Sequence, residues 1–261
     1  MTRTHRVLDV LRMVSGDGAG LTVLQIAERL SCARATAYRC IADLEAGGLI
    51  ERGNEGNYVL GPTIVELDRH IRLSDPLIQA AKPVMRGLCD RTGAAILLCR
   101  IHGHKVLCVH QFSGPRAPNN VSYERGRAMP LYRGATSHAI LAHLDPRRLE
   151  TLVQQDAQGL LDAGFAITIP ALTAQLAEMR RQAVFRTDGE IDADAIGWAV
   201  ALYHGKQLLG SLSVVMDRAH GVDHGGAIAD QVRRAGLRIE GILEGRRTPR
   251  RAASGAVRDA D

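Results

Sequence analysis

The chain has 261 residues, enough for two domains, one small and one of ordinary size. Hydrophobic residues make up 46% of it and charged residues 23%, which is a globular composition, and no apolar run approaches the ~20 residues that span a bilayer. The formal charge of +5 is unevenly spread. Residues 1–61 hold 7 arginines against 7 acidic residues, so charge alone does not indicate a nucleic-acid partner.

The N-terminal segment MTRTHRVLDVLRMV lacks the unbroken apolar core of a signal peptide, because Arg6, Asp9 and Arg12 interrupt it. The 5 cysteines are an odd number, and without an export signal they are expected to be reduced and mostly buried. These features predict a cytoplasmic protein with no membrane partner.

A capping box is predicted at the start of the first of two short helices. Thr22 and Gln25 stand three residues apart before an apolar run, the spacing at which each side chain can bond the other residue's backbone N–H. Leu24, Ala27 and Leu30 then recur at three-residue steps, which predicts that they share the buried face.

The second helix of the pair has an apolar face and a polar face. Ala37, Ile41 and Leu44 recur at helical spacing and are expected to be buried, and Gly47-Gly48 can end the helix. In a helix-turn-helix the polar face of this helix enters the major groove of DNA. The predicted DNA-binding residues are Arg34, Ala35, Thr36, Tyr38 and Arg39, with Arg52 just beyond the helix.

Two strand-like segments follow, at 49–52 and 57–60, joined by the turn signal Asn54-Glu55-Gly56. A helix pair followed by a hairpin is the order of a winged helix-turn-helix, so residues 1–61 are predicted to form a DNA-binding domain. The same order also occurs in domains that do not touch DNA, and an arginine-bearing helix face is often merely solvated.

Residues 62–75 predict a single linker helix. Ile64, Leu67 and Ile71 form an apolar stripe on it that nothing nearby in the sequence covers. One reading helix covers only half of a symmetric operator. Both observations predict a homodimer or homotetramer.

Residues 76–245 alternate between helical and strand-like segments. Apolar hairpins are predicted around His102-Gly103-His104 and around His204-Gly205, with amphipathic helices before, between and after them. Antiparallel strands flanked by helices predict an α+β domain. Residues 246–261 hold 5 arginines and almost no large apolar side chains, which predicts a disordered basic tail.

These segments together resemble the IclR-type bacterial transcriptional regulators. The resemblance rests on ARATAYRCIADLEAGGLIE and YVLG in the first domain, YERGRAMPLYRGATSHAILAHL at 123–144, and DGEIDADAIGWAVALYHGKQLLGSLSVV at 188–215. It implies a winged helix-turn-helix, a linker helix and a GAF-like sensor domain that binds a small metabolite. It also implies dimers or tetramers that bind partly palindromic double-stranded DNA operators.

The resemblance also implies where the metabolite binds. Gly134-Ala135-Thr136-Ser137 offers small side chains and free backbone N–H groups at a helix start, where the helix dipole favours an anion. The expected effector is therefore a small carboxylate, with apolar walls around its body. The predicted effector-binding residues are Met129, Leu131, Ala135, Thr136, Asp188, Gly197, Trp198 and Ser213, with Arg133 or Arg100 as a cation for the carboxylate.

The chain departs from the family pattern near this site. Ser137-His138 stands where the family usually has Gly-Lys, and Ala201 stands where it has proline. These differences concern the ligand rather than the fold. From the residues alone, Thr136 reads as a plain helix cap and Ser213 as an ordinary strand serine.

A rival hypothesis rests on the first hairpin. Cys99, His102, His104, Cys108 and His110 are residue types that hold zinc, so a metal-dependent sensor or enzyme is the alternative function. Strand alternation disfavours it, because Cys99 sits in the other strand and two of the histidines fall at the turn. Phosphate-loop, serine-hydrolase and zinc-peptidase motifs are missing from the sequence. We therefore predict no catalytic residue, no cofactor and no metal.

Overall fold

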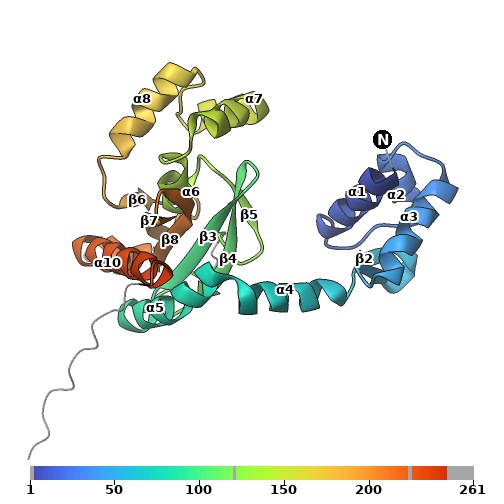
Figure 1. The fold of residues 1–261 in the computed structure, drawn as a ribbon, viewed down its shortest axis with the longest axis horizontal. Helices are drawn as coiled ribbons and strands as arrows, with labels where there is room; N and C mark the ends of the chain where they lie inside the picture. The colour runs from blue at the N-terminus through green and yellow to red at the C-terminus, as the bar shows by residue number, and fades with distance from the viewer. Residues whose placement is uncertain (1–2, 120–121, 223–224, 246–261) are drawn as a thin grey trace, which may run out of the picture. The chain divides into compact units, whose positions relative to one another are not determined.

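The computed structural model describes residues 3–119, 122–222 and 225–245. It divides the chain into two compact units, residues 1–75 and 76–261, each built around its own core (Figure 1). The predicted basic tail at 246–261 lies outside the described residues.

The first unit is a winged helix-turn-helix followed by one more helix. Strands β1 and β2 pair antiparallel, with Glu51 opposite Val59, and form the wing. Its elements are α1 (Arg3–Ser15), α2 (Val23–Arg29), α3 (Arg34–Ala46), β1 (Ile50–Arg52), a short 3-10 turn η1 (Asn54–Gly56), β2 (Tyr58–Leu60) and α4 (Thr63–Ser74).

The capping box at the start of α2 is confirmed. The Thr22 backbone N–H donates to Gln25 Oε1 over 2.8 Å, and the Gln25 N–H donates to Thr22 Oγ1 over 3.4 Å. Two of the four N–H groups that a helix start leaves without a helical partner are thereby satisfied.

The predicted buried face of α3 is confirmed, whereas that of α2 is partly wrong. Ala37, Ile41 and Leu44 are buried, but Leu24 is 52% exposed and Ile26 takes the core position beside Ala27. Each residue turns a helix by about 100°, so Leu24 and Ile26 point to nearly opposite sides. The three-residue spacing from Leu24 to Ala27 therefore did not identify the buried face of α2, which is centred on Ile26 and Ala27.

The second unit is a six-stranded antiparallel sheet with helices on both faces. The strand order is β5-β4-β3-β8-β7-β6. Its elements are α5 (Pro76–Thr92), β3 (Ala95–His102), β4 (Lys105–Phe112), β5 (Ala128–Pro130), α6 (Gly134–Leu141), α7 (Pro146–Asp162), α8 (Ile169–Met179), β6 (Phe185–Asp188), β7 (Ala195–His204), β8 (Gln207–Asp217), α9 (Arg218–Gly221) and α10 (Gly225–Leu243).

Both faces of this sheet are buried. Leu98 on β3 belongs to a core shared with α5 and α10, whereas its neighbour Leu97 belongs to the core beneath α6, α7 and α8. Figure 1 shows α5 and α10 together on one side and α6 to α8 on the other. The predicted α+β class and flanked antiparallel sheet are confirmed.

Strand β6 is an element that the sequence did not reveal. It has only four residues, of which Phe185 alone is buried, and it forms the sheet edge by pairing with β7. Within the described residues, no helix is long and apolar enough to cross a membrane.

The burial of α2 yields a paired stability prediction. Ile26→Ala is expected to lower the free energy of unfolding of the first unit by about 2–5 kcal/mol, because it deletes buried methyl groups. Leu24→Ala, at an exposed position of the same helix, is expected to change it by less than about 1 kcal/mol. Hydrogen exchange of peptides from α2 and α3 measures both, and equal losses of protection would contradict this core assignment.

Candidate DNA-reading helix and effector cavity

The exposed face of α3 carries the predicted DNA-binding residues. Arg34, Ala35 and Tyr38 are exposed, and Tyr38 shows 52% of its surface. Arg34 forms no hydrogen bond or ion pair with any residue that the structure describes, so its guanidinium is available to a partner. Thr36 is half-buried beside them.

The other two arginines are held by neighbours. Arg39 lies along its own helix, donating from Nε to the Ala35 carbonyl over 3.3 Å and from Nη2 to Thr36 Oγ1 over 3.4 Å. Arg52 is exposed on β1 with its guanidinium 6.0 Å from the centre of the Tyr58 ring, a cation–π distance. The unit thus presents cations from both the helix and the wing.

The start of α6 closes over a small cavity of about 30 Å³ in the second unit. The predicted residues Ala135, Thr136 and Gly197 line it, as do Tyr123, Thr187, Glu190, Ile191 and Val215. The space is smaller than the pockets of about 300–1,000 Å³ that hold drug-sized ligands.

Buried hydroxyl groups lie beneath α6. Thr136 Oγ1 donates to Ser213 Oγ over 2.9 Å, and Ser211 Oγ donates to the Thr136 carbonyl over 3.0 Å. Ser211 and Ser213 are 0% exposed and Thr136 is 3% exposed. Thr136 and Ser213, predicted from segments 77 residues apart, are therefore brought into direct contact.

Tyr123 closes another side of this cavity. Its hydroxyl donates to the Arg133 carbonyl over 2.6 Å and lies 2.5 Å from Ser137 Oγ. Burial raises the pKa of the Tyr123 phenol well above its usual value, so the hydroxyl stays protonated and remains a donor near neutral pH.

The N–H groups at the start of α6 are already bonded within the chain. The Gly134 N–H donates to Glu190 Oε1 over 3.0 Å, and the Ala135 N–H donates to Thr187 Oγ1 over 3.1 Å. The sequence did not identify Thr187 or Glu190 as site residues. The acidic sequence DGEID at 188–192 is the feature that could have indicated them. Which of its residues face α6 depends on how β6 pairs with β7, and the sequence does not show that pairing.

Other predicted effector residues are placed away from the cavity. The Asp188 carboxylate pairs with Arg186 over 3.1 Å and with Arg218 over 3.0 Å. Met129 packs against the core beneath α6, α7 and α8, and Leu131 is buried in that core.

The structure does not bring Trp198 to this cavity. This residue is 1% exposed and packs in the core shared with α5 and α10, on the face of the sheet opposite the cavity. Its neighbour Gly197 lines the cavity, and successive residues of a strand point to opposite faces. The two residues could not both have served as walls of one site.

The two candidate cations do not reach into the cavity. Arg133 is exposed and donates from Nη2 to the Glu190 carbonyl over 2.9 Å, which helps to hold the segment after β6 in place. Arg100 lies on β3, outside the residues that line the cavity.

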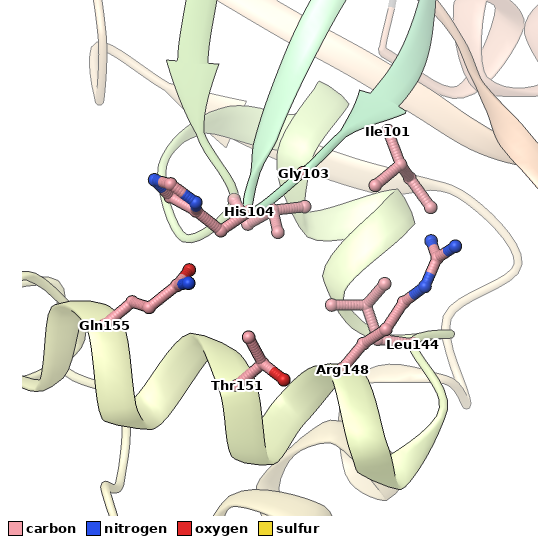
Figure 2. Close-up of a pocket in the computed structure, with 8 residues that line it drawn as sticks. Ile101, Gly103, His104, Leu144, Arg148, Thr151 and Gln155 are labelled. Carbon is pink, nitrogen blue, oxygen red and sulfur yellow. The ribbon is translucent and has the colours of Figure 1, made fainter. Parts of the chain in front are cut away.

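A larger cavity of about 310 Å³ lies between the tip of the β3–β4 hairpin and α7. Figure 2 shows His104, Arg148, Thr151 and Gln155 around an open space, with Ile101 and Leu144 beside it. The buried Leu131 also lines this cavity. Polar and apolar side chains both line it, so it is a second place where a small molecule could fit.

The hairpin does not gather its cysteines and histidines at one point. Cys99 and Cys108 are buried cross-strand partners, whereas His102 and His104, candidate ligands of the rival hypothesis, lie exposed at the hairpin tip. The pKa of the Cys99 thiol is raised, mainly by burial and to a smaller extent by the hydrogen bond with Cys108. A raised pKa disfavours the thiolate, the form of cysteine that binds zinc. Among the described residues, no three His, Cys, Asp or Glu side chains converge on a possible metal position.

Comparison with known proteins agrees with this architecture. The family model for the C-terminal part of the bacterial transcriptional regulator IclR matches residues 72–240, and the IclR helix-turn-helix model matches residues 4–53. The chain belongs to the IclR family.

Individual curated relatives share a third or less of their residues with this chain over the aligned part. A helix-turn-helix transcriptional regulator of Mycobacterium tuberculosis is 32% identical over 144 residues, covering 55% of this chain and 54% of the relative. The chain spans about half the length of the first curated relatives that it matches.

Solved structures match over more of the chain. An IclR homologue from Microbacterium hydrocarbonoxydans, complexed with 4-hydroxybenzoate, has a TM-score of 0.74 at 25% identity and covers 94% of this chain and 100% of its own. An IclR-type structure from Silicibacter has a TM-score of 0.76 at 21% identity, with 95% and 98% covered, which supports the fold alone.

Proposed function

We propose that the chain is a cytoplasmic DNA-binding transcriptional regulator whose operator affinity responds to a small carboxylate bound at the start of α6. The observation that carries the DNA-binding part is the exposed face of α3, where Arg34, Tyr38 and Arg39 stand on a winged helix-turn-helix. A guanidinium can contact either a guanine edge or a phosphate, which are the two kinds of contact that a recognition helix makes.

The effector part is supported by the chemistry at α6. Backbone N–H groups at a helix start favour an anion, and the hydroxyl groups of Thr136 and Ser213 lie directly beneath. A homologue of similar fold was crystallised with 4-hydroxybenzoate, an aromatic carboxylate. This role requires no catalytic group.

The arginines of α3 provide the test of DNA binding. Arg34→Ala and Arg39→Ala are each expected to weaken binding to a genomic fragment selected by the wild-type protein. A lost base contact costs ~1–3 kcal/mol for the preferred base, whereas a lost phosphate contact lowers the salt slope by about one unit.

Gel-shift titrations at several salt concentrations distinguish these two effects. Arg12→Ala, which removes the same charge from an exposed position on α1, is the control and is expected to bind like the wild type. Unchanged affinity in both α3 variants would show that this face does not read DNA.

A second pair of variants tests where the effector binds. Thr136→Val keeps the side-chain shape but removes the hydroxyl, and is expected to weaken carboxylate binding while DNA binding without ligand survives. Thr151→Val makes the same change on α7, where Thr151 lines the larger cavity instead.

Thermal-shift titrations with 4-hydroxybenzoate, benzoate and hexanoate supply the measurement, because a ligand at 100 times its Kd stabilises the folded state by about 2.7 kcal/mol. A loss of the shift in Thr151→Val but not in Thr136→Val would place the effector in the cavity beside α7.

We further propose that α4 packs against α4 of a second copy of the chain. Within the described residues α4 has no buried side chain, and Leu67 and Ile71 of its apolar stripe are 49% and 54% exposed. An amphipathic helix with an uncovered apolar face is stabilised by burying that face. Pairing would also supply the second reading helix that a symmetric operator needs.

Leu67→Glu combined with Ile71→Glu is therefore expected to lower both the oligomeric state and the affinity for DNA. Arg69→Glu produces the same change of two charge units at an exposed polar position of α4 and is expected to leave the mass unchanged. Light scattering at micromolar concentration reports the mass. A monomeric wild-type protein that still binds its operator tightly would refute the pairing.

A further inference from the structure

The start of α6 already holds a carboxylate, that of Glu190. The Gly134 N–H donates to Glu190 Oε1 over 3.0 Å, and His138 Nε2 lies 3.5 Å from the same oxygen. Gly134 is buried, and the Glu190 side chain that accepts from it is 31% exposed. Glu190 therefore occupies the place that an anionic ligand of α6 would take.

The segment that carries Glu190 is fixed at several points. Asp192 accepts from the Ser122 N–H over 3.0 Å and from Ser122 Oγ over 2.5 Å. Ile191 packs directly on Gly134, since a Cβ added at Gly134 would lie 2.9 Å from Ile191 Cγ1. Residues 189–194 thus form a strap across the start of α6, which we call the acidic strap.

The acidic strap accounts for the small size of the cavity. Glu190, Ile191 and Asp192 all line the remaining 30 Å³, which is too small for a benzoate ring. The other walls include Val215, Ala195 and Gly197, which are small or apolar. A ligand with a carboxylate and an apolar body fits this site only after Glu190 has moved away.

We propose that Glu190 is an internal competitor that determines which carboxylates this regulator detects. The inference rests on the effector site proposed above. A free carboxylate that displaces Glu190 replaces hydrogen bonds of the same kind, so the exchange of head groups gains little. A tethered group also acts at an effective concentration on the order of millimolar.

Selection follows from that exchange. Acetate and similar small anions have no apolar body to bury, so they do not displace Glu190 at ordinary concentrations. A carboxylate with a ring or alkyl chain gains additional binding free energy by burying that body against the apolar walls. Glu190 thereby excludes the small carboxylates and admits the amphipathic ones.

The substitution Glu190→Ala provides a direct test. It removes one methylene carbon and the carboxylate, which are the same heavy atoms as those of an acetate ion, so acetate can fill the space that is left. Acetate is expected to raise the Tm of the full-length Glu190→Ala protein above its value in sodium chloride of equal ionic strength. The Tm of the wild type is expected to be the same in both salts.

Asp194→Ala is the matched control, since it removes an exposed acidic side chain from the same strap without lining the cavity. It is expected to behave like the wild type. A gain in acetate equal to that of Glu190→Ala would mean that the general loss of negative charge, not the vacated position, attracts acetate, and the proposal would be wrong.

Titration with 4-hydroxybenzoate tests the competition itself. Its Kd is expected to fall about tenfold or more in Glu190→Ala. In this variant the ligand no longer has to break the hydrogen bond between the Glu190 carboxylate and the Gly134 N–H. Glu190→Gln keeps the shape of the side chain and is expected to shift the Kd in the same direction, which covers the case in which the alanine variant does not fold.

Three results separate this proposal from the function on which it rests. Weaker 4-hydroxybenzoate binding in both Glu190 variants would make Glu190 a direct contact and overturn the competition, while the effector site stands. Acetate stabilising the wild type and Glu190→Ala equally would also overturn it. A third result is that acetate raises the Tm of Glu190→Ala while none of the tested amphipathic carboxylates binds the wild type. It would support the role of Glu190 at the Gly134 N–H and refute the effector site.

Discussion

The second unit is organised around the backbone N–H groups that begin α6. A helix start leaves its first N–H groups without helical partners, and at α6 these groups are buried rather than solvated. A buried N–H without a partner costs about 1–3 kcal/mol, so each must be satisfied by a side chain or by a ligand. Thr187 and Glu190 satisfy two of them here. The short edge strand β6 matters because its pairing with β7 sets Thr187 opposite Gly197, beside α6.

The same constraint explains the composition of the strands below α6. Gly197 lies beneath the start of α6, and an added Cβ there would be in ordinary van der Waals contact with Ala135 at 3.5 Å. Ser211 and Ser213 on β8 supply hydroxyl groups on the α6 side, whereas Leu212 between them faces α5 and α10. A sheet with two buried faces thus packs mainly apolar side chains against α5 and α10 and allows a few polar groups on the other face, where they bond α6.

Local patterns predicted local structure well. The capping box of α2, the apolar face of α3 and the antiparallel hairpins follow from spacings of two to four residues, and the structure contains them. The proposed effector site is different, because Glu190 and Thr187, which accept from the first N–H groups of α6, come from a segment more than 50 residues away. No periodicity reveals that Glu190 rather than Asp188 meets Gly134. Trp198 was misplaced for a simpler reason, since strand alternation alone shows that it cannot share a wall with Gly197.

A regulator needs two states that its effector distinguishes, because a ligand shifts an equilibrium only by its differential affinity for the two forms. In our proposal, the contact between Glu190 and Gly134 supplies such a difference. A ligand too large for 30 Å³ binds only when Glu190 has left Gly134, so its binding free energy is gained in the open form alone. By linkage, whatever favours the open strap also favours the ligand, and the reverse holds equally. If the proposal holds, the effect of the carboxylate on DNA binding depends on which form of the strap the operator-bound protein adopts.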